Sequence, residues 1–279
     1  MTTATMTGLS SGDKPRVLLS LESGIADVRL NRPRKRNALD PEMFHALFEA
    51  AQCVRTAAGV RVVVISGEGP DFCAGLDFAA FDAMRSGRRL SDLANLPPTD
   101  GPTRGTGQRL VMEWAAVPVP VVAAIHGNAL GGGLQLALAA DIRIAASDAR
   151  LSVPEVAWGL VPDMAATQLL PGLVGRDVAK DLVFTARVLT GDEAARVGLV
   201  TRTAANPREA SLALAREMAT LSPDAVRASK RLLDLAGHID LDSGLTKEQD
   251  EISALIGTPN QVEAVEARFE KRPPEFTDV

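Results

Sequence analysis

The sequence predicts an α/β core followed by a helical C-terminal region. Over the first two-thirds of the chain, apolar runs of strand length alternate with segments of helical periodicity. From Pro207 onward the pattern is mostly helical, and Pro223 and Pro259 mark the starts of further helices. Three consecutive glycines, Gly131 to Gly133, connect an apolar strand-like run to an apolar helix-like run. These observations together favour an α/β protein with a helical appendage.

The N-terminal end of the core is expected to begin with a hairpin. Val17–Leu21 and Ile25–Leu30 are short strand-like runs on either side of Glu22-Ser23-Gly24. Residues 1–14 are rich in Thr, Ser and Gly and contain no apolar run. We therefore expect this segment to be a disordered tail and not a signal peptide.

Caps and apolar runs predict the elements that follow. Asp40 is placed to cap a helix that has Pro41 at its first position and apolar residues at helical spacing as far as Val54. Thr190 and Glu193 have the spacing of a capping box, and Gly198 is expected to end that short helix. Buried strands are expected at residues 60–65, 118–125, 142–145 and 151–153.

One segment interrupts this alternation. Residues 84–108 carry Arg85, Arg88 and Arg89 together with several prolines and glycines. Such a composition favours either a mobile excursion that covers a site or a disordered surface loop.

Composition and charge exclude several classes of function. The net charge of −5 argues against nucleic acid as the main partner, because phosphate binding needs a basic surface. Cys53 and Cys73 form no CxxC pair or Cys/His cluster, so we expect reduced thiols, no metal site and a cytoplasmic protein. No apolar run approaches the ~18 residues of a membrane span, and no membrane association is predicted.

The glycine turn is the most informative local feature. Glycines leave backbone N–H groups accessible because no Cβ blocks them, and the dipole of a helix favours negative charge at its N-terminus. The turn is therefore suited to an oxygen that becomes negative during a reaction. A dinucleotide site is not predicted, because Gly127 and Gly131 to Gly133 lack the G-x-G-x-x-G spacing.

Several stretches along the chain form a recognisable ordered set. They are Asn31-Arg32-Pro33 with Asn37-Ala38-Leu39, Phe72 to Asp77, Gly127 to Gln135, Pro154-Glu155 with Gly159 to Pro162, Leu189-Thr190-Gly191, and Glu270-Lys271-Arg272. In this order they resemble the crotonase or enoyl-CoA hydratase/isomerase superfamily. The resemblance implies a spiral of ββα turns over residues 15–205 and a helical oligomerisation region over residues 206–279. It also implies an acyl-CoA thioester substrate, in which CoA enters with the substrate and not as a cofactor, and a homotrimer or dimer of trimers.

The family holds the thioester carbonyl oxygen with two backbone N–H groups. The positions that match are Leu76 and Gly132. Removing a proton next to a thioester carbonyl, or adding a nucleophile in conjugation with it, produces an enolate. Two fixed N–H donors typically stabilise such an oxyanion by several kcal/mol.

The acid/base positions depart from the pattern of the family's hydratases. Those enzymes have glutamates at the positions of Gln135 and Glu155, and the two carboxylates activate water. Gln135 does not titrate, so water addition is in doubt, whereas Glu155 lies among apolar neighbours that should raise its pKa.

Asp163 is a second acidic candidate. Dienoyl-CoA isomerases resemble this chain in having an aspartate at that position, although they also have one where Gln135 lies. A helix N-cap is the alternative interpretation of Asp163. We therefore favour double-bond isomerisation of an enoyl- or dienoyl-CoA over hydration of a 2-enoyl-CoA, and over a catalytically weak acyl-CoA-binding protein. Nucleophilic catalysis by Cys73 with His126 has little support, because no third orienting group is evident.

The resemblance also places the CoA moiety and the acyl group. Arg34 to Arg36 form a basic cluster suited to CoA phosphates, and Lys271 could assist from the same or a neighbouring subunit. The acyl pocket is expected to involve the segment at residues 84–108 together with Phe78, Phe81, Trp114 and Trp158. The predicted substrate and CoA contacts are Arg34, Lys35, Arg36, Ala38, Ala74, Gly75, Asp77, Gly131, Trp158 and Lys271.

Overall fold

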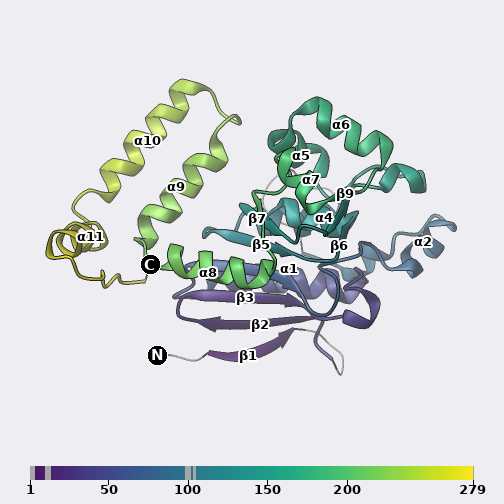
Figure 1. Ribbon diagram of the computed structural model, residues 1–279, viewed down its shortest axis with the longest axis horizontal. Coiled ribbons are helices and arrows are strands. Elements are labelled where there is room, and N and C mark those ends of the chain that lie inside the picture. Colours follow the sequence, from purple (N-terminus) through teal and green to yellow (C-terminus); the bar gives the residue numbers. More distant parts are fainter. Residues whose placement is uncertain (1–3, 10–13, 98–101, 103–104, 279) are drawn as a thin grey trace.

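The computed structural model describes residues 4–9, 14–97, 102 and 105–278, and Figure 1 shows a twisted sheet with helices on both faces. The larger sheet has the strand order β1-β2-β3-β4-β5-β7-β10. β1, β2 and β3 pair antiparallel, and every pair from β3 to β10 is parallel. The strands are β1 (Ala4–Leu9), β2 (Val17–Glu22), β3 (Ile25–Leu30), β4 (Val62–Gly67), β5 (Val121–Ile125), β7 (Ile142–Ala145) and β10 (Arg202–Thr203).

The N-terminal prediction is confirmed in one part and wrong in another. The hairpin of β2 and β3 forms as expected, with Leu21 opposite Ala26. The expected disordered tail is wrong for Ala4–Leu9, because these residues form β1 and pair with β2 through backbone hydrogen bonds. The parts of the predicted tail at residues 1–3 and 10–13 lie outside the described residues.

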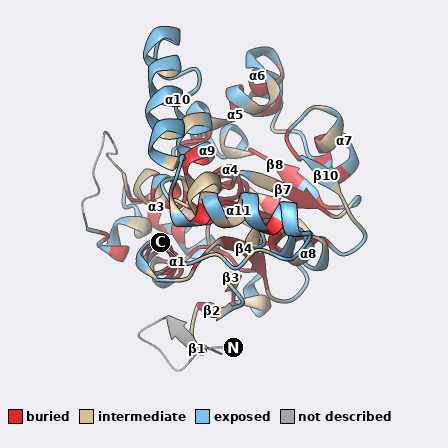
Figure 2. Ribbon diagram, turned by 90° about the vertical axis from the view of Figure 1, so that its left-hand side faces the viewer, coloured by how far each residue is buried: buried red, intermediate tan, exposed pale blue. Residues whose placement is uncertain are grey.

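Both faces of the parallel strands are buried. Val62 and Val64 of β4 pack in a cluster with α8 (Pro207–Ala219), whereas Val63 and Ile65 point to the opposite face. That second face is covered by α1 (Pro41–Thr56) and α3 (Thr106–Ala115), and Figure 2 shows the buried strands between these layers. Burial on both faces explains why β4 and β5 are almost entirely apolar runs in the sequence. Asp40 caps α1 as predicted, since its side chain accepts the N–H of Met43.

A second, smaller sheet carries the glycine turn. It consists of β6 (Asn128–Leu130), β8 (Arg150–Ser152) and β9 (Leu189–Thr190). The three glycines therefore connect a strand to a helix, as expected, but the strand next to them is the short β6, which was not among the predicted strands. β6 lies between β5 and α4 (Gly132–Leu138), because the chain changes sheets at Gly127, which has φ +56°.

The segment at residues 84–108 has more regular structure than a disordered loop. α2 (Phe78–Met84) leads into it, a 3-10 helix forms at Leu90–Ala94, and α3 begins at Thr106. A disordered loop is therefore wrong for these parts. Residues 98–101 and 103–104 of the predicted excursion lie outside the described residues.

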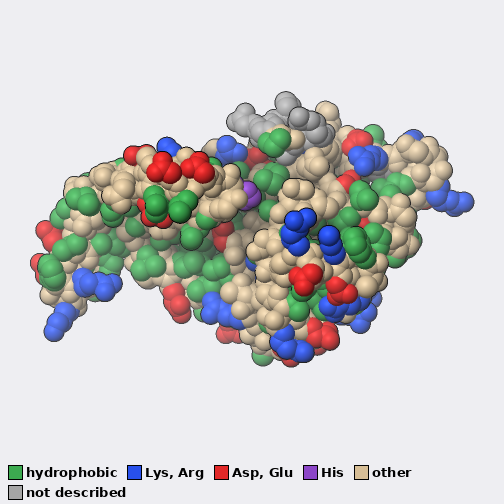
Figure 3. All heavy atoms as spheres, turned by 90° about the horizontal axis from the view of Figure 1, so that it is seen from above, with side chains coloured by type: hydrophobic (Ala, Val, Ile, Leu, Met, Phe, Trp, Pro, Cys, Tyr) green, Lys and Arg blue, Asp and Glu red, His purple; other side chains and the backbone are tan. Residues whose placement is uncertain are grey.

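The C-terminal region is helical, as predicted: α8 packs on the larger sheet, whereas α9 (Pro223–Leu235), α10 (Leu241–Leu255) and α11 (Pro259–Glu270) form an arm that extends away from the sheets (Figure 1). Lys230 of α9 attaches it to the core through Asp141 and the carbonyl of Val119. Hydrophobic side chains gather on this arm (Figure 3), and α10 buries none of its own. None of the described helices is long and apolar enough to cross a membrane. The remaining helices are α5 (Ala166–Val174), α6 (Arg176–Thr185) and α7 (Gly191–Arg196), with 3-10 turns at Pro33–Lys35 and Glu155–Trp158.

Candidate active site

Two backbone N–H groups lie where the Phe72-to-Asp77 segment meets the start of α4. Gly131 precedes the helix with φ +51° and ψ −123°, a conformation open essentially to glycine alone. The N–H groups of Leu76 and Gly132 donate to no acceptor within the described part of the chain. Both residues line the same two neighbouring cavities. The geometry therefore leaves two donors available to a ligand oxygen at the predicted positions.

Close packing holds these two segments together. Leu39 fixes one of them by donating to the carbonyl of Gly75 at 2.8 Å and accepting from the N–H of Asp77 at 3.1 Å. Gly133 of α4 faces the same segment so closely that an added Cβ would lie 2.3 Å from the carbonyl oxygen of Cys73.

We expect Gly133→Ala to impair both stability and turnover. Forcing the two segments apart should cost ~1–3 kcal/mol of unfolding free energy. It should also lower kcat by about ten- to hundredfold, because the two donors lose their alignment. Urea unfolding and initial rates would measure both effects. Gly172→Ala is the matched control, because its Cβ would meet nothing within 4 Å in α5. A Gly133→Ala protein with native kcat would contradict the prediction.

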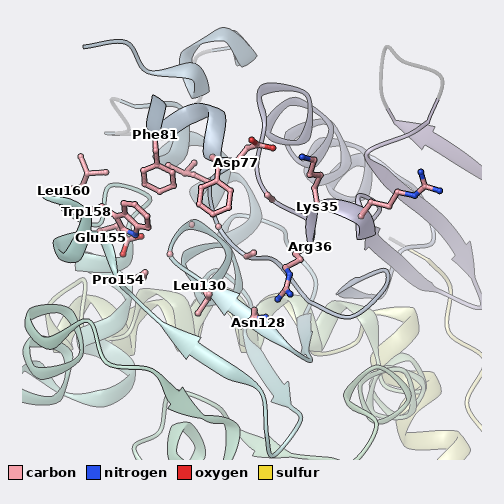
Figure 4. Close-up of a pocket in the computed structure, with 18 residues that line it drawn as sticks. Lys35, Arg36, Asp77, Phe81, Asn128, Leu130, Pro154, Glu155, Trp158 and Leu160 are labelled. Atoms are coloured by element: carbon pink, nitrogen blue, oxygen red, sulfur yellow. The ribbon is translucent and has the colours of Figure 1, made fainter. Parts of the chain in front are cut away.

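The first cavity has a volume of about 580 Å³, and its two sides carry different kinds of side chain (Figure 4). Lys35 and Arg36 lie at one side of it, and Phe81, Trp158 and Glu155 lie at the other. The rings of Phe81 and Trp158 are 4.4 Å apart between centroids and form an apolar wall. The cavity is lined by the predicted contacts Arg34, Lys35, Arg36, Ala38, Ala74, Gly75, Asp77, Gly131 and Trp158, by Leu76, Gly132 and Glu155, and by Phe78, Phe81, Asn128, Leu130, Pro154 and Leu160.

Glu155 begins the 3-10 turn that follows β8 and borders both cavities. Its Oε1 accepts a hydrogen bond from Gln135 Nε2 at 2.7 Å. Its Oε2 is out of contact with solvent and has no hydrogen-bond partner among the described residues. Burial is the largest cause that raises the pKa of Glu155 above its ordinary value, and the charge of Asp163 acts in the same direction. The raised pKa agrees with the sequence-based expectation.

Gln135 lies on α4 and is almost fully buried. Its Oε1 accepts the N–H of Met164 at 2.9 Å and that of Ala166 at 3.3 Å. Two backbone donors on one side therefore fix the amide orientation and direct the NH₂ group toward Glu155. Gln135 thus connects Glu155 to the start of α5.

The second cavity adjoins the first and has a volume of about 280 Å³. Leu76, Gly132, Glu155 and Leu160 line both cavities, so the two N–H groups and the carboxylate lie where the cavities meet. Side chains that border the second cavity alone include Phe44, Met84, Arg88, Arg89, Ser91, Gln135, Val161, Asp163 and Met164.

Asp163 is not a helix cap, because α5 begins at Ala166 with Ala165 in the capping position. Its carboxylate is half-exposed and forms an ion pair with Arg89 at 3.3 Å. The sequence identifies Arg88 and Arg89 only as part of the arginine-rich segment, and not as site residues. The cluster Arg85, Arg88, Arg89 was the available signal, but sequence could not indicate which of its members face a cavity.

Three predicted residues lie apart from the cavities or serve a structural purpose. Trp114 is buried in the core and lines neither cavity, so its assignment to the acyl pocket is wrong. Lys271 follows α11 and lines neither cavity of its own chain; its contribution from a neighbouring subunit stays a prediction. Asp77 lines the first cavity, but its carboxylate caps α2 and pairs with Arg32, and the cap lowers its pKa.

The geometry also gives no support to nucleophilic catalysis. Cys73 Sγ donates to the carbonyl of Asn37, and burial raises the pKa of this thiol to about 12. His126 Nε2 instead contacts the carbonyl oxygen of Gly69. No group of His, Cys, Asp and Glu within the described ranges could hold a metal ion.

Comparisons with known proteins agree with this architecture. A family model described as enoyl-CoA hydratase/isomerase matches residues 20–279. Mitochondrial methylglutaconyl-CoA hydratase of Mus musculus is 36% identical over 260 residues, which cover 91% of this chain and 79% of that protein. Mitochondrial enoyl-CoA hydratase domain-containing protein 2 of Mus musculus is 38% identical over 268 residues, covering 94% and 87%. The crystal structure of enoyl-CoA hydratase from Bacillus anthracis has a TM-score of 0.83 at 30% identity, covering 94% of this chain and 99% of that chain.

The chain therefore has the fold of acyl-CoA enzymes of the crotonase type. It belongs to the enoyl-CoA hydratase/isomerase family, and the resemblance found in its motifs is confirmed.

Proposed function

We propose that this protein moves the carbon–carbon double bond of an enoyl- or dienoyl-CoA, with Glu155 as the principal acid/base. The observation that carries the proposal is the hydrogen bonding of Gln135. Its amide oxygen is occupied by the N–H groups of Met164 and Ala166, and its NH₂ group donates to Glu155. An amide cannot take up the proton of a water molecule at neutral pH, so the pair of carboxylates that activates water is incomplete.

A single carboxylate is sufficient for double-bond migration. Glu155 would remove a proton from one end of the allylic system and return it to the other end, with no change in composition. The intermediate dienolate carries its negative charge on the thioester oxygen. The free N–H groups of Leu76 and Gly132, which border the same two cavities as Glu155, are suited to stabilise it.

Asp163 extends the proposal to dienoyl thioesters. It borders the second cavity together with Glu155, and its charge contributes to the raised pKa of Glu155. In a longer conjugated system the reacting carbons lie farther apart, and Asp163 would carry the proton at the distal end.

Hydration of a 2-enoyl-CoA is the second candidate. The two mouse relatives are named as hydratases, at 36% and 38% identity. In that reaction Glu155 alone would activate water, and the remaining N–H of Gln135 could hold it. A third alternative is an acyl-CoA-binding protein with negligible turnover.

A substrate panel distinguishes these functions. The purified protein would be incubated with crotonyl-CoA, a 3-enoyl-CoA and dienoyl-CoA thioesters, and the products separated by chromatography. We expect migration of the double bond. Robust hydration of crotonyl-CoA without any isomerisation would overturn the proposal in favour of the hydratase. Tight binding without turnover on the whole panel would favour the binding protein.

The remaining assignments follow from the first cavity and the C-terminal arm. Arg34, Lys35 and Arg36 would hold the CoA phosphates, because they form the cationic side of that cavity. The exposed apolar face of α9 to α11 is suited to a homotrimer or dimer of trimers. The cytoplasmic location stays a prediction, and the two mouse relatives are named as mitochondrial.

A further inference from the structure

Two arginines border the second cavity, although a hydrocarbon chain would need no cationic contact. Arg88 and Arg89 both border it, together with the hydroxyl of Ser91. Asp163 neutralises Arg89 through their ion pair at 3.3 Å. Arg88 contacts Ser86 Oγ through its Nε and forms no ion pair with any described residue. Glu155 also borders this cavity, but its hydrogen bonding does not involve Arg88, and Arg88 is thus left without a carboxylate partner among the described residues.

CoA phosphates do not account for this charge. The basic cluster Arg34 to Arg36 lines the first cavity, and neither Arg88 nor Arg89 does. A thioester with its carbonyl oxygen at Leu76 and Gly132 lies where the cavities meet. With CoA in the first cavity, its acyl group would enter the second cavity, which contains the two arginines.

We propose that the second cavity selects acyl-CoA substrates that carry a carboxylate at the far end of a short acyl chain, with Arg88 and Arg89 as the specificity-determining residues. This inference rests on the proposed placement of the thioester. A carboxylate forms charge-assisted hydrogen bonds with guanidinium groups, and the planar fork can bind both of its oxygens. Both arginines are exposed, so binding demands little desolvation of the ion pair. Phe44, Met84 and Met164 supply apolar contact for the methylene groups.

The test compares two saturated thioesters of equal chain length, glutaryl-CoA and pentanoyl-CoA, by isothermal titration calorimetry. Neither has a double bond to move, so binding is measured independently of the proposed reaction. We expect glutaryl-CoA to bind about tenfold more tightly, and Arg88→Ala to remove most of this difference between the two affinities. Arg88→Lys should retain part of the preference, because the charge remains.

Arg85→Ala is the matched control. Arg85 lies on the same segment, is exposed, pairs with Asp82 at 3.6 Å and borders neither cavity. Its replacement should leave the preference intact. Equal affinities in the native protein, or equal effects of Arg85→Ala and Arg88→Ala, would overturn the inference. Failure of both thioesters to bind would overturn it together with the proposed CoA site. A clear preference for glutaryl-CoA without turnover on the substrate panel would refute only the proposed reaction.

Discussion

Replacing Glu155 with Gln is expected to lower kcat for double-bond migration by about 10²–10⁴-fold, the range for loss of a general acid/base. The affinity for a saturated acyl-CoA should be nearly unchanged, since glutamine preserves the shape of the side chain. Steady-state kinetics on the best substrate of the panel would measure kcat, and calorimetry would measure affinity. Glu22→Gln, at an exposed glutamate of β2, is the control and should retain native kinetics.

The pH profile supplies a second readout for Glu155. Burial raises the pKa of this carboxyl above its ordinary value, and the nearby charge of Asp163 adds to the shift. The base must be ionised in the free enzyme, so kcat/KM should rise with pH through that raised pKa. A raised carboxyl pKa also means that ionised Glu155 destabilises the fold at neutral pH. Glu155→Gln should therefore be at least as stable as the native protein. A variant that keeps most of its activity would exclude Glu155 as the acid/base.

Local signals predict much of the fold, and pairing between distant segments explains the exceptions. The parallel strands β4 and β5 are predictable because burial on both faces makes their runs almost entirely apolar, whereas β7 also buries Arg143. β1 and β6 are not predictable in this way. Ala4–Leu9 joins the sheet through its backbone and lacks a continuous apolar run, and Asn128–Leu130 is a strand only because it pairs with Arg150 to Ser152.

The same distinction applies to the candidate site. The motifs placed Leu76, Gly132 and Glu155 together because each belongs to a recognisable local stretch. The orientation of the Gln135 amide depends on the N–H groups of Met164 and Ala166, which a different segment supplies. Likewise, the second cavity forms where α2, the 3-10 turn at Leu90–Ala94 and the residues just before α5 meet. No single stretch of sequence contains that information.

Replacing Gln135 with Glu is expected to convert the site toward water addition. The variant would place a second carboxyl where Nε2 now donates to Glu155 Oε1 at 2.7 Å. Two carboxyl groups at that distance share a proton, which strongly raises one of the two pKa values. The ionised member could then accept a proton from water while the protonated member donates one to the α-carbon. We expect the rate of crotonyl-CoA hydration to rise by about 10²-fold or more and the isomerisation rate to fall.

Stability supplies an independent check on Gln135→Glu. The Met164 and Ala166 N–H groups can still donate to the new carboxyl, so the fold should be retained. Because the pair has a raised pKa, its contribution to stability is present at low pH and is lost as pH rises through that value. The melting temperature of the variant should thus fall more steeply toward neutral pH than that of the native protein.

Asp163→Asn is the control for this substitution. It removes a carboxylate that is not hydrogen-bonded to Glu155, and it should not create hydratase activity. A contrary result is a Gln135→Glu protein that folds, shows this pH dependence and still does not hydrate crotonyl-CoA. In that case the missing carboxylate does not limit hydration, and Gln135 gives no reason to prefer isomerisation.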